Sequence, residues 1–585
     1  MVKKIFGQML ITQIVSSMTV MICMLVDSIL IGRFLGINSM TAYGLTTPVL
    51  LVFVSIGSVL SAGVQVMCGK TMGSGDRQGT NETFSISFTT AAVIAIVGVI
   101  LVVTLIGPLC TMLGAGQAVP DNEVFFLTKD YLFGFIIGAP AFILAQIMVP
   151  YMQMSGNRLR LVIAVSALTV GDIIFDLLNV FVFHGGTLGM GLASSLSYYL
   201  AFFIGGAYFL KKDCMFRFTR KGLRWNRLLE MFKHGIPTAI NQVSLVLLVF
   251  FFNKMLLEVG GNLAVAAYSV ISTMSNICYS FGGGIGAVAL MLAAIFYGDE
   301  DRESLYEVVR TMVRKSIVID TTVVAVLLAA SPLLVKMFLT DNVAATDMAT
   351  LGLRLFSLSL LFSAVNVSFK NYYQGVRQMF LAQLIAFTES FFFPVLSAFL
   401  LSRVLGTTGV WLGWLCGEIL TLVTFSGIVW KRSGKVGFAA RNYAMLPEDL
   451  GARDEDCLDL KVENLAEAMD ASMQAEAFCK AHGLPARETM LIPLCIEEMV
   501  TNIVDHGFTK DQRTDHRIEV RLMLKEEKRL IRIRDNCVNF DPIEYVKLHE
   551  ADDPTSRFGI RMIMKMVKDA NYVSSLGLNN LTLVL

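Results

Sequence analysis

The chain is 585 residues long, which exceeds the size of one ordinary domain. Hydrophobic residues make up 55% of it and charged residues 16%, whereas soluble domains carry about 25% charged residues. The formal net charge of +1 and the lack of a close C-x-x-C pair argue against a basic nucleic-acid-binding protein and against a zinc or redox motif.

Apolar residues are concentrated in residues 1–430, while residues 432–585 have the charge density of a soluble protein. A membrane-spanning helix needs about 20 mostly apolar residues, and this window predicts about twelve spans. The predicted spans are 8–34, 45–69, 84–107, 129–153, 161–183, 188–210, 235–257, 263–296, 313–338, 350–373, 380–403 and 408–430. We therefore expect an all-α membrane region followed by a soluble domain.

Positive charge gathers in alternate connections between the predicted spans, and loops rich in Lys and Arg remain in the cytoplasm. The residues concerned are Lys3, Lys4, Arg158, Arg160, Lys211, Lys212, Arg217, Arg220, Lys221, Arg224, Arg227, Lys233, Arg314, Lys315, Lys431, Arg432 and Lys435. With an even number of spans, this bias predicts a multi-pass protein of the cell (inner) membrane with both termini in the cytoplasm.

The two halves of the membrane region repeat each other. Five residues recur 225 positions later: Gly36, Tyr43, Gly73, Asp76 and Arg77 return as Gly261, Tyr268, Gly298, Asp301 and Arg302. Further on, GTLGMGLAS at 186–194 matches GTTGVWLGW at 406–414. Six helices per repeat preserve topology, so we expect parallel repeats about an axis along the membrane normal, with a site between them. The predicted boundaries are an N-terminal lobe (1–210), a cytoplasmic connection (211–234) and a C-terminal lobe (235–431).

Three stretches carry a family resemblance: VDSILIGRFLG (26–36), DIIFDLLNVFVF (172–183) and HGIPTAINQ (234–242). They resemble helix 1, the passage from helix 5 to helix 6, and the entry to helix 7 of the multidrug and toxic compound extrusion (MATE) family. The resemblance covers about 430 residues in order. It implies an antiporter, driven by H⁺ or Na⁺, that exports small organic compounds, often amphipathic or cationic.

Buried carboxylates are the candidate coupling groups, because an ionised Asp at the bilayer centre costs about 2.5–3.5 kcal/mol and usually faces a cavity. Asp172, Asp176 and Asn179 share one helix face by their spacing, and Asp27 lies in the first span. Such carboxylates either take up protons or supply oxygen ligands to a cation. The MATE resemblance places coupling acids on helices 1 and 5, where Asp27 and Asp176 match, whereas Asp172 stands where many relatives have Asn. The alternative is that these acids pair with buried donors and lock the helices together.

Two further intramembrane acids, Glu389 and Glu418, lie in the second half of the membrane region. We expect Glu389 to pair with Lys370 or Arg377 in a structural role. Helix 7 contains no acid before Glu258, which favours a coupling site in the N-terminal lobe.

The tail begins with a mixed-charge linker (432–455) and continues as one domain (456–585). A strand at CLDLKV, helices at 463–483 and 486–506, a hairpin of RIEVRLML and RLIRIRDN, a helix near 557–569 and a closing hairpin are predicted. This order indicates an α+β sandwich with helices on one face of an antiparallel sheet.

Two motifs in the tail resemble the GHKL ATPases, closest to the anti-sigma-factor serine kinases. EEMVTNIVDHG (497–507) resembles the N-box, which implies that Asn502 holds Mg²⁺ and that Glu498 acts as a base. RDNCVNFDP (534–542) stands at the adenine box, which makes Asp535 the acceptor for the adenine amino group. Thr582 in the closing strand matches a residue often near adenine.

The tail also departs from the family pattern. Cys537 and Asn539 replace both glycines of the adenine box, and SRFGIRMI (556–563) keeps Gly559 but has Arg557 where the family has glycine. Glycines let backbone approach phosphate closely, so their loss weakens the case for ATP, although Arg557 is itself a phosphate ligand by type. Whether the tail binds Mg-ATP, hydrolyses it or phosphorylates Ser/Thr is left open.

We therefore expect primarily a transporter, embedded in lipid and regulated by its nucleotide-binding-like tail. The sequence has no Walker P-loop motif of the kind that would indicate primary, ATP-driven transport. A cytoplasmic regulator protein and dimerisation through the tail are further expectations, and nucleic acid is not. One alternative is a membrane receptor whose tail is a kinase or partner-binding module. A third is a flippase for lipid-linked substrates, which is less favoured because Lys254 and Lys370 are the only evident intramembrane cations.

Overall fold

The computed structural model describes residues 2–116, 122–211, 214–219, 225–336, 343–448, 450–508, 516–525, 528–548 and 558–585. These residues form two compact units. One is helical and contains most of residues 1–446, and the other is built mainly from residues 447–585 around a β-sheet.

The first unit consists of long helices interrupted by short π-helical turns. Its elements are α1 (Val2–Leu30), η1 (Ile31–Leu35), α2 (Ile37–Gly73), α3 (Arg77–Thr104), α4 (Ile106–Met112), α5 (Glu123–Ile136), α6 (Ala139–Met154), α7 (Arg158–Leu178), η2 (Asn179–Phe183), α8 (Gly186–Gly206), α9 (Trp225–Gly298), α10 (Arg302–Lys336), α11 (Val343–Gly375), α12 (Met379–Phe387), η4 (Thr388–Phe392), α13 (Phe393–Leu405), α14 (Thr407–Ser433) and α15 (Ala440–Tyr443).

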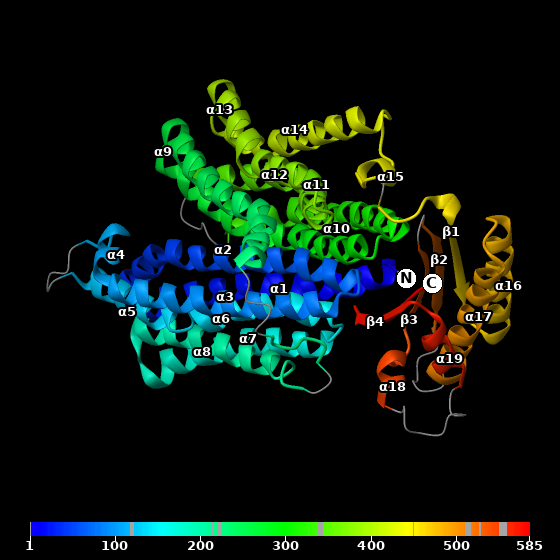
Figure 1. The fold of residues 1–585 in the computed structure, drawn as a ribbon. Helices are drawn as coiled ribbons and strands as arrows, with labels where there is room; N and C mark the ends of the chain where they lie inside the picture. The colour runs from blue at the N-terminus through cyan, green and yellow to red at the C-terminus, as the bar shows by residue number, and fades with distance from the viewer. Residues whose placement is uncertain are drawn as a thin grey trace. The chain divides into compact units, whose positions relative to one another are not determined.

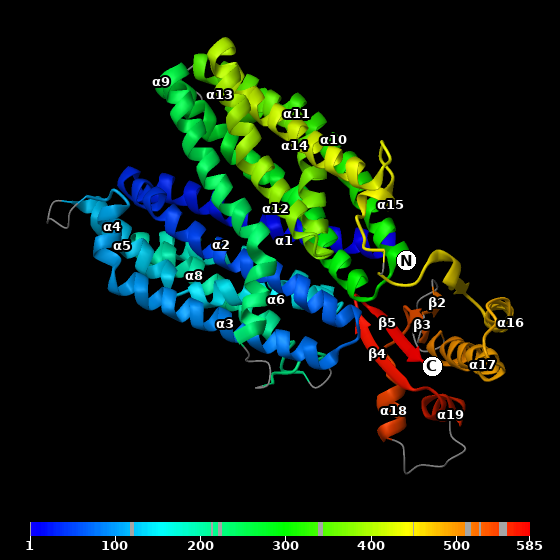
Figure 2. The ribbon, with the colours of Figure 1, turned by 45° about the horizontal axis from the view of Figure 1, so that its top comes forward.

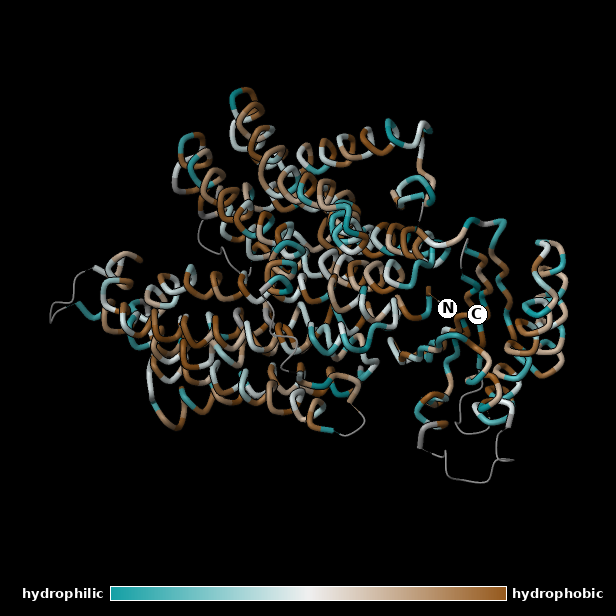
Figure 3. Tube along the Cα trace, in the orientation of Figure 1, coloured by the Kyte–Doolittle hydropathy of each residue, from teal (hydrophilic) through white to brown (hydrophobic). Residues whose placement is uncertain are grey.

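Within the described residues, eleven helices are long and apolar enough to cross a membrane, and one bent pair makes up to twelve. This confirms the predicted all-α membrane region, and hydrophobic residues predominate along these helices in Figure 3. The predicted span 129–153 is two helices, α5 and α6, that meet at 45°. Predicted spans seven and eight run together in α9, where Gly261 breaks the helix with a φ of 62°. Such a φ suits glycine because it has no Cβ.

The helices gather in two lobes that follow the sequence repeat. Figures 1 and 2 show α1 to α8 in one bundle and α9 to α14 in the other. The lobes touch mainly through α1 and α2 on one side and α9, α10 and α11 on the other. A site between parallel six-helix repeats is the expected consequence of this arrangement.

The two lobes pack most closely at one end, where the repeat counterparts Gly73 and Gly298 lie. A Cβ added to Gly73 would lie 2.0 Å from the carbonyl oxygen of Ile295, and one added to Gly298 would lie 2.2 Å from that of Lys70. We call this the glycine contact. At the same end of the α2 and α9 pair, the buried Glu82 of α3 forms an ion pair of 2.8 Å with Arg227 of α9.

The second unit is a five-stranded antiparallel sheet in the order β1-β2-β3-β5-β4. Its elements are η5 (Asp454–Asp456), β1 (Cys457–Val462), α16 (Leu465–Ala481), α17 (Ala486–Asn502), η6 (Ile503–Gly507), β2 (Ile518–Leu524), β3 (Arg529–Asp535), α18 (Pro542–Leu548), α19 (Phe558–Met566), β4 (Asp569–Ser575) and β5 (Leu578–Val584). Figure 1 shows α16 and α17 side by side along the sheet.

Alternation of apolar residues positions one face of the sheet on the helices. Ile531 and Ile533 of β3 and Leu581 and Leu583 of β5 share a buried core with residues of α16 and α17. The predicted α+β sandwich is therefore confirmed. The short helix α18 was not predicted, because its seven residues offer too little periodicity to be seen in sequence.

Candidate functional sites

Three aspartates from two helices meet inside the N-terminal lobe. Asp27 comes from α1, and Asp172 and Asp176 lie one turn apart on α7. All three are buried, and one carboxylate oxygen of each lies within 4.8 Å of the others. The two acids of α7 thus share one helix face, and the structure brings Asp27 of α1 to them.

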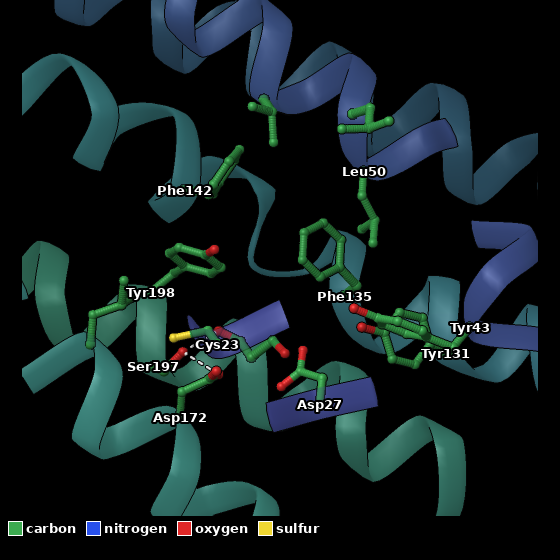
Figure 4. A pocket seen from close by; sticks show the side chains of 14 residues that line it. Cys23, Asp27, Tyr43, Leu50, Tyr131, Phe135, Phe142, Asp172, Ser197 and Tyr198 are labelled. Atoms are coloured by element: carbon green, nitrogen blue, oxygen red, sulfur yellow. Dashed lines mark hydrogen bonds between the residues drawn. The ribbon is translucent and has the colours of Figure 1, made fainter. Parts of the chain in front are cut away.

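Asp27 and Asp172 border a small cavity, which Figure 4 shows from close by. Its volume is about 40 Å³, and Cys23, Ser197 and Tyr198 belong to its walls. A water molecule needs about 10–15 Å³ by this measure, while drug-sized pockets hold about 300–1,000 Å³. The cavity therefore suits water or a small cation rather than an organic compound.

The three carboxylates differ in how far they are engaged. Asp172 accepts a hydrogen bond of 3.0 Å from the Ser197 hydroxyl on α8, whereas one oxygen of Asp27 and both oxygens of Asp176 are buried without a donor in the described structure. Among the described residues that line the cavity, none is a Lys or Arg. Three ionised carboxylates this close in a low-dielectric site repel one another strongly, so the arrangement demands protons or a bound cation.

Asn179 is the first residue of η2, directly after α7, and its side chain hydrogen-bonds to the backbone turn that follows. Its side-chain Nδ2 donates to the carbonyl of Gly186 at 3.0 Å, and its Oδ1 accepts from the Gly185 N–H at 3.1 Å. Both ends of the amide are thus occupied in the turn between η2 and α8. The predicted role of Asn179 beside the three aspartates therefore stays a prediction, since its amide is engaged with the backbone.

The repeat is broken at the position of Asp27. The counterpart of Asp27, 225 residues later, is Phe252, which is buried in the C-terminal lobe. Its ring lies 4.8 Å from that of Trp414 and 6.1 Å from that of Tyr268. An aromatic core therefore occupies the place in the second lobe that a carboxylate occupies in the first.

In the tail, the N-box residues lie on one side of the sheet. Asn502 donates to the Glu498 carbonyl at 2.6 Å on α17. A Cβ added to Gly559, at the start of α19, would lie 2.0 Å from the Glu498 carboxylate. The structure therefore brings Glu498 and Gly559 into direct contact. Arg557 lies outside the described residues.

Asp535 ends β3 on the helix-covered face, where it is buried. Its Oδ1 accepts from the Cys537 N–H at 2.9 Å and from the Asn579 amide at 2.8 Å, while Asn579 Oδ1 accepts from the Tyr572 hydroxyl at 2.8 Å. Burial raises the pKa of Asp535, and the hydrogen bonds from Cys537 and Asn579 act in the opposite direction. Asp535 is thus fixed at the end of β3 by hydrogen bonds to Oδ1 from a backbone N–H and a side-chain amide.

The sheet register separates Thr582 from this site. Asp535 pairs with Asn579 across β3 and β5, so both side chains lie on the same face. Thr582 is three residues further along β5, and an odd separation turns a strand side chain to the opposite face. Thr582 therefore lies on the opposite face of the sheet from Asp535, and its place near adenine stays a prediction, while Asn579 is a neighbour of Asp535 that the sequence did not indicate.

The glycine replacement at Cys537 is accommodated by a glycine elsewhere. A Cβ added to Gly507, at the end of η6, would lie 3.2 Å from both Cβ and Sγ of Cys537. The thiol therefore occupies the space that a side chain at Gly507 would need. Cys537 Sγ also lies 3.8 Å from His516 Nδ1.

Comparison with known proteins agrees with these geometries. The sequence model of the MatE family matches residues 13–178 and 237–400, which is more than half of the chain. The chain belongs to the MATE family. A second model, of the histidine kinase-like ATPase domain, matches residues 461–585, so this MATE protein carries an ATPase-like domain at its C-terminus.

Curated relatives resemble the membrane region. Multidrug export protein MepA of Staphylococcus saprophyticus is 23% identical over 382 residues, covering 64% of this chain and 82% of MepA. Probable multidrug resistance protein NorM of Thermotoga maritima is 22% identical over 422 residues, covering 69% of this chain and 88% of NorM.

Solved structures share the fold. A MATE family transporter of the MOP superfamily in an outward-facing conformation matches with a TM-score of 0.68 and 19% identity, over 74% of this chain and 96% of its own. The MATE transporter VcmN of Vibrio cholerae, in its bent form, matches with a TM-score of 0.66 and 18% identity, over 72% and 95%. This multi-pass membrane protein therefore has the MATE fold.

Several residues around the MATE carboxylates were not singled out from the sequence. Cys23, Ser197, Tyr131 and Tyr198 line the cavity, and the buried Asp320 of α10 is a further intramembrane acid. Ser197 follows Ser194 by three residues in an apolar helix, and this polar residue in an apolar segment was the one sequence signal for it. The others are indistinguishable from packing residues until their partners are known.

Proposed function

We propose that the protein is a cation-coupled antiporter that exports small organic, amphipathic or cationic compounds across the cell (inner) membrane. The observation that carries this proposal is the cluster of Asp27, Asp172 and Asp176 beside a cavity without Lys or Arg. Such a cluster changes its affinity for H⁺ or Na⁺ when its surroundings change. MATE membership and the names of its multidrug relatives support the substrate class.

The three carboxylates have different roles in ion coupling. Asp172 is held by Ser197 and positions the site, while Asp27 and Asp176 offer their unpartnered oxygens to the ion. When the ion leaves, repulsion between Asp27 and Asp176 favours a different placement of α1 against α7. That displacement links ion binding to the rearrangement of the lobes.

The test uses the full chain reconstituted in vesicles, with ethidium as the exported probe and either a pH or a Na⁺ gradient as the driving force. Asp27→Asn and Asp176→Asn are expected to abolish gradient-driven export. Asp347→Asn, which changes an exposed acid on α11, is the matched control. The active gradient identifies the ion, and unchanged export in both site variants would overturn the proposal.

We also propose that the tail regulates export by binding Mg-ATP, with both termini in the cytoplasm. Support comes from the match to the histidine kinase-like ATPase domain and from Asp535, which is held by hydrogen bonds on the helix-covered face. Asn502 and Glu498 are the expected Mg²⁺ ligand and base. The bias of Lys and Arg supports the orientation.

Calorimetric titration of the full chain in lipid nanodiscs with Mg-ATP tests this second proposal. Asp535→Asn is expected to abolish the binding heat, and Asp470→Asn, at an exposed site on α16, is expected to preserve it. No heat in the unaltered protein at millimolar nucleotide would refute nucleotide binding. The tail would then act as a docking module for a regulator protein.

A further inference from the structure

The C-terminal lobe contains a second buried group of ionisable side chains, far in sequence from the three aspartates. Lys370 comes from α11, Glu389 from η4 and Glu418 from α14, and each is less than a tenth exposed. The turn that holds Glu389 is π-helical, a distortion found frequently at functional sites.

The positive charge in this group is already balanced by one carboxylate. Lys370 Nζ lies 3.3 Å from Glu389 Oε2 and donates to Asn241 Oδ1 at 2.5 Å. Ser390 donates to the same Asn241 oxygen at 3.0 Å. The predicted pairing of Glu389 with Lys370 is confirmed, and Arg377 instead pairs with Glu230.

Glu418 has no such counter-charge. Its Oε2 accepts from the Asn366 amide at 2.7 Å, and in the described part of the chain no Lys or Arg forms an ion pair with it. The Asn366 side chain is fully buried, and its Oδ1 has no donor. The Asn366 amide nitrogen also donates to the Glu418 backbone carbonyl at 2.9 Å, so Asn366 holds Glu418 through neutral hydrogen bonds.

The charge balance of this group indicates that Glu418 carries a proton. The group contains two carboxylates and one ammonium, so one negative charge is left in a low-dielectric interior, where an unpaired charge is strongly unfavourable. A proton on Glu418 removes that charge and creates an O–H donor. The proton can sit on the other carboxyl oxygen, so that Oε2 continues to accept from Asn366.

We propose that Glu418 carries an exchangeable proton, which makes the C-terminal lobe a proton-binding site. Protonation adds one H⁺ from water to a carboxylate oxygen, and deprotonation returns it to water. The other titratable groups that act on Glu418 are Glu389 and Lys370, and Tyr279 faces both glutamates from α9. The proposal does not depend on the N-terminal site, because Lys370, Glu389 and Glu418 all belong to the C-terminal lobe.

The experiment is infrared difference spectroscopy of the full chain in nanodiscs during a pH titration, which detects the C=O stretch of protonated carboxylic acids. Glu418→Gln, which preserves shape, is expected to remove one pH-dependent component of this band. Glu258→Gln, at an exposed position on α9, is the matched control and retains it. Asp27→Asn is expected to leave the Glu418 component in place, so failure at one site is distinguishable from failure at the other.

The charge balance also predicts the sign of two further changes. Glu389→Gln is expected to lose the Glu418 component too, because Lys370 then requires Glu418 as its counter-charge. Lys370→Met is expected to gain a component, since both glutamates then need protons. Should Glu418→Gln fail to fold, Glu418→Asp keeps a carboxyl and must shift the component. A spectrum unaltered by Glu418→Gln, or a component that persists unchanged across the whole titration, overturns the proposal.

Discussion

Gly298→Ala is expected to separate the lobes at the glycine contact. The added Cβ would lie 2.2 Å from the Lys70 carbonyl oxygen and 2.8 Å from the Lys70 Cα, both below the 3.0 Å that real Cβ atoms respect. These neighbours are backbone atoms, so no side chain can turn away. The two helices must therefore move apart by about 1 Å, or the packed arrangement must give way to another.

The size of the effect follows from the packing cost. Overpacking a well-packed interior costs about 1–3 kcal/mol. An arrangement in which the lobes are apart at this end does not carry that cost, so the ratio of the two arrangements shifts about 5–150-fold toward the separated one. A protein that alternates between such arrangements should then populate the separated state measurably.

Pulsed electron–electron double resonance measures this shift. Spin labels on a ketone-bearing unnatural residue at Lys4 of α1 and Arg310 of α10, both exposed, avoid the ten native cysteines. Gly298→Ala should add a longer distance between the labels. Gly427→Ala is the matched control, because no atom lies within 4 Å of its added Cβ. Identical distance distributions and thermal stability for both variants would refute the reasoning.

Three other changes test the structure. Arg227→Gln leaves the buried Glu82 without its guanidinium partner. This variant should lower the melting temperature more than the double variant Arg227→Gln/Glu82→Gln does. Equal decreases in the two melting temperatures would count against a role of the ion pair. Ser197→Ala removes the hydrogen bond to Asp172, which contributes about 1 kcal/mol. The KM for the coupling ion, measured by transport in vesicles, should therefore rise about fivefold. An unchanged KM would contradict the positioning role of Ser197. Because burial raises the pKa of Asp535, its charge destabilises the folded tail at neutral pH. Asp535→Asn should therefore slow hydrogen exchange of the tail at pH 7. The difference in exchange rate from the wild type should shrink as the pH falls, because the wild-type carboxyl then becomes neutral. A difference that does not change with pH would exclude the charge of Asp535 as its cause.

The sequence by itself determined the architecture. Long apolar runs set the spans because hydrocarbon thickness requires about 20 apolar residues per helix, and recurrence of Gly73 as Gly298 revealed the two lobes. Strand alternation in the tail predicted its sheet, and the N-box motif predicted its ATPase-like fold. These signals are local, since each is carried by neighbours within one element or by a fixed offset.

Only the tertiary structure decided which side chains meet. In lipid, helix faces toward neighbours and toward the membrane are both apolar, so hydropathy does not say that α8 brings Ser197 to Asp172 or that Glu418 is left without a cation. Asn179 shares a helix face with the aspartates, yet its amide is taken by the turn that follows. In the tail, alternation fixes the faces within β5, but pairing with β3 sets the register. That register, which depends on hydrogen bonds between strands distant in sequence, places Asn579 beside Asp535 and turns Thr582 away.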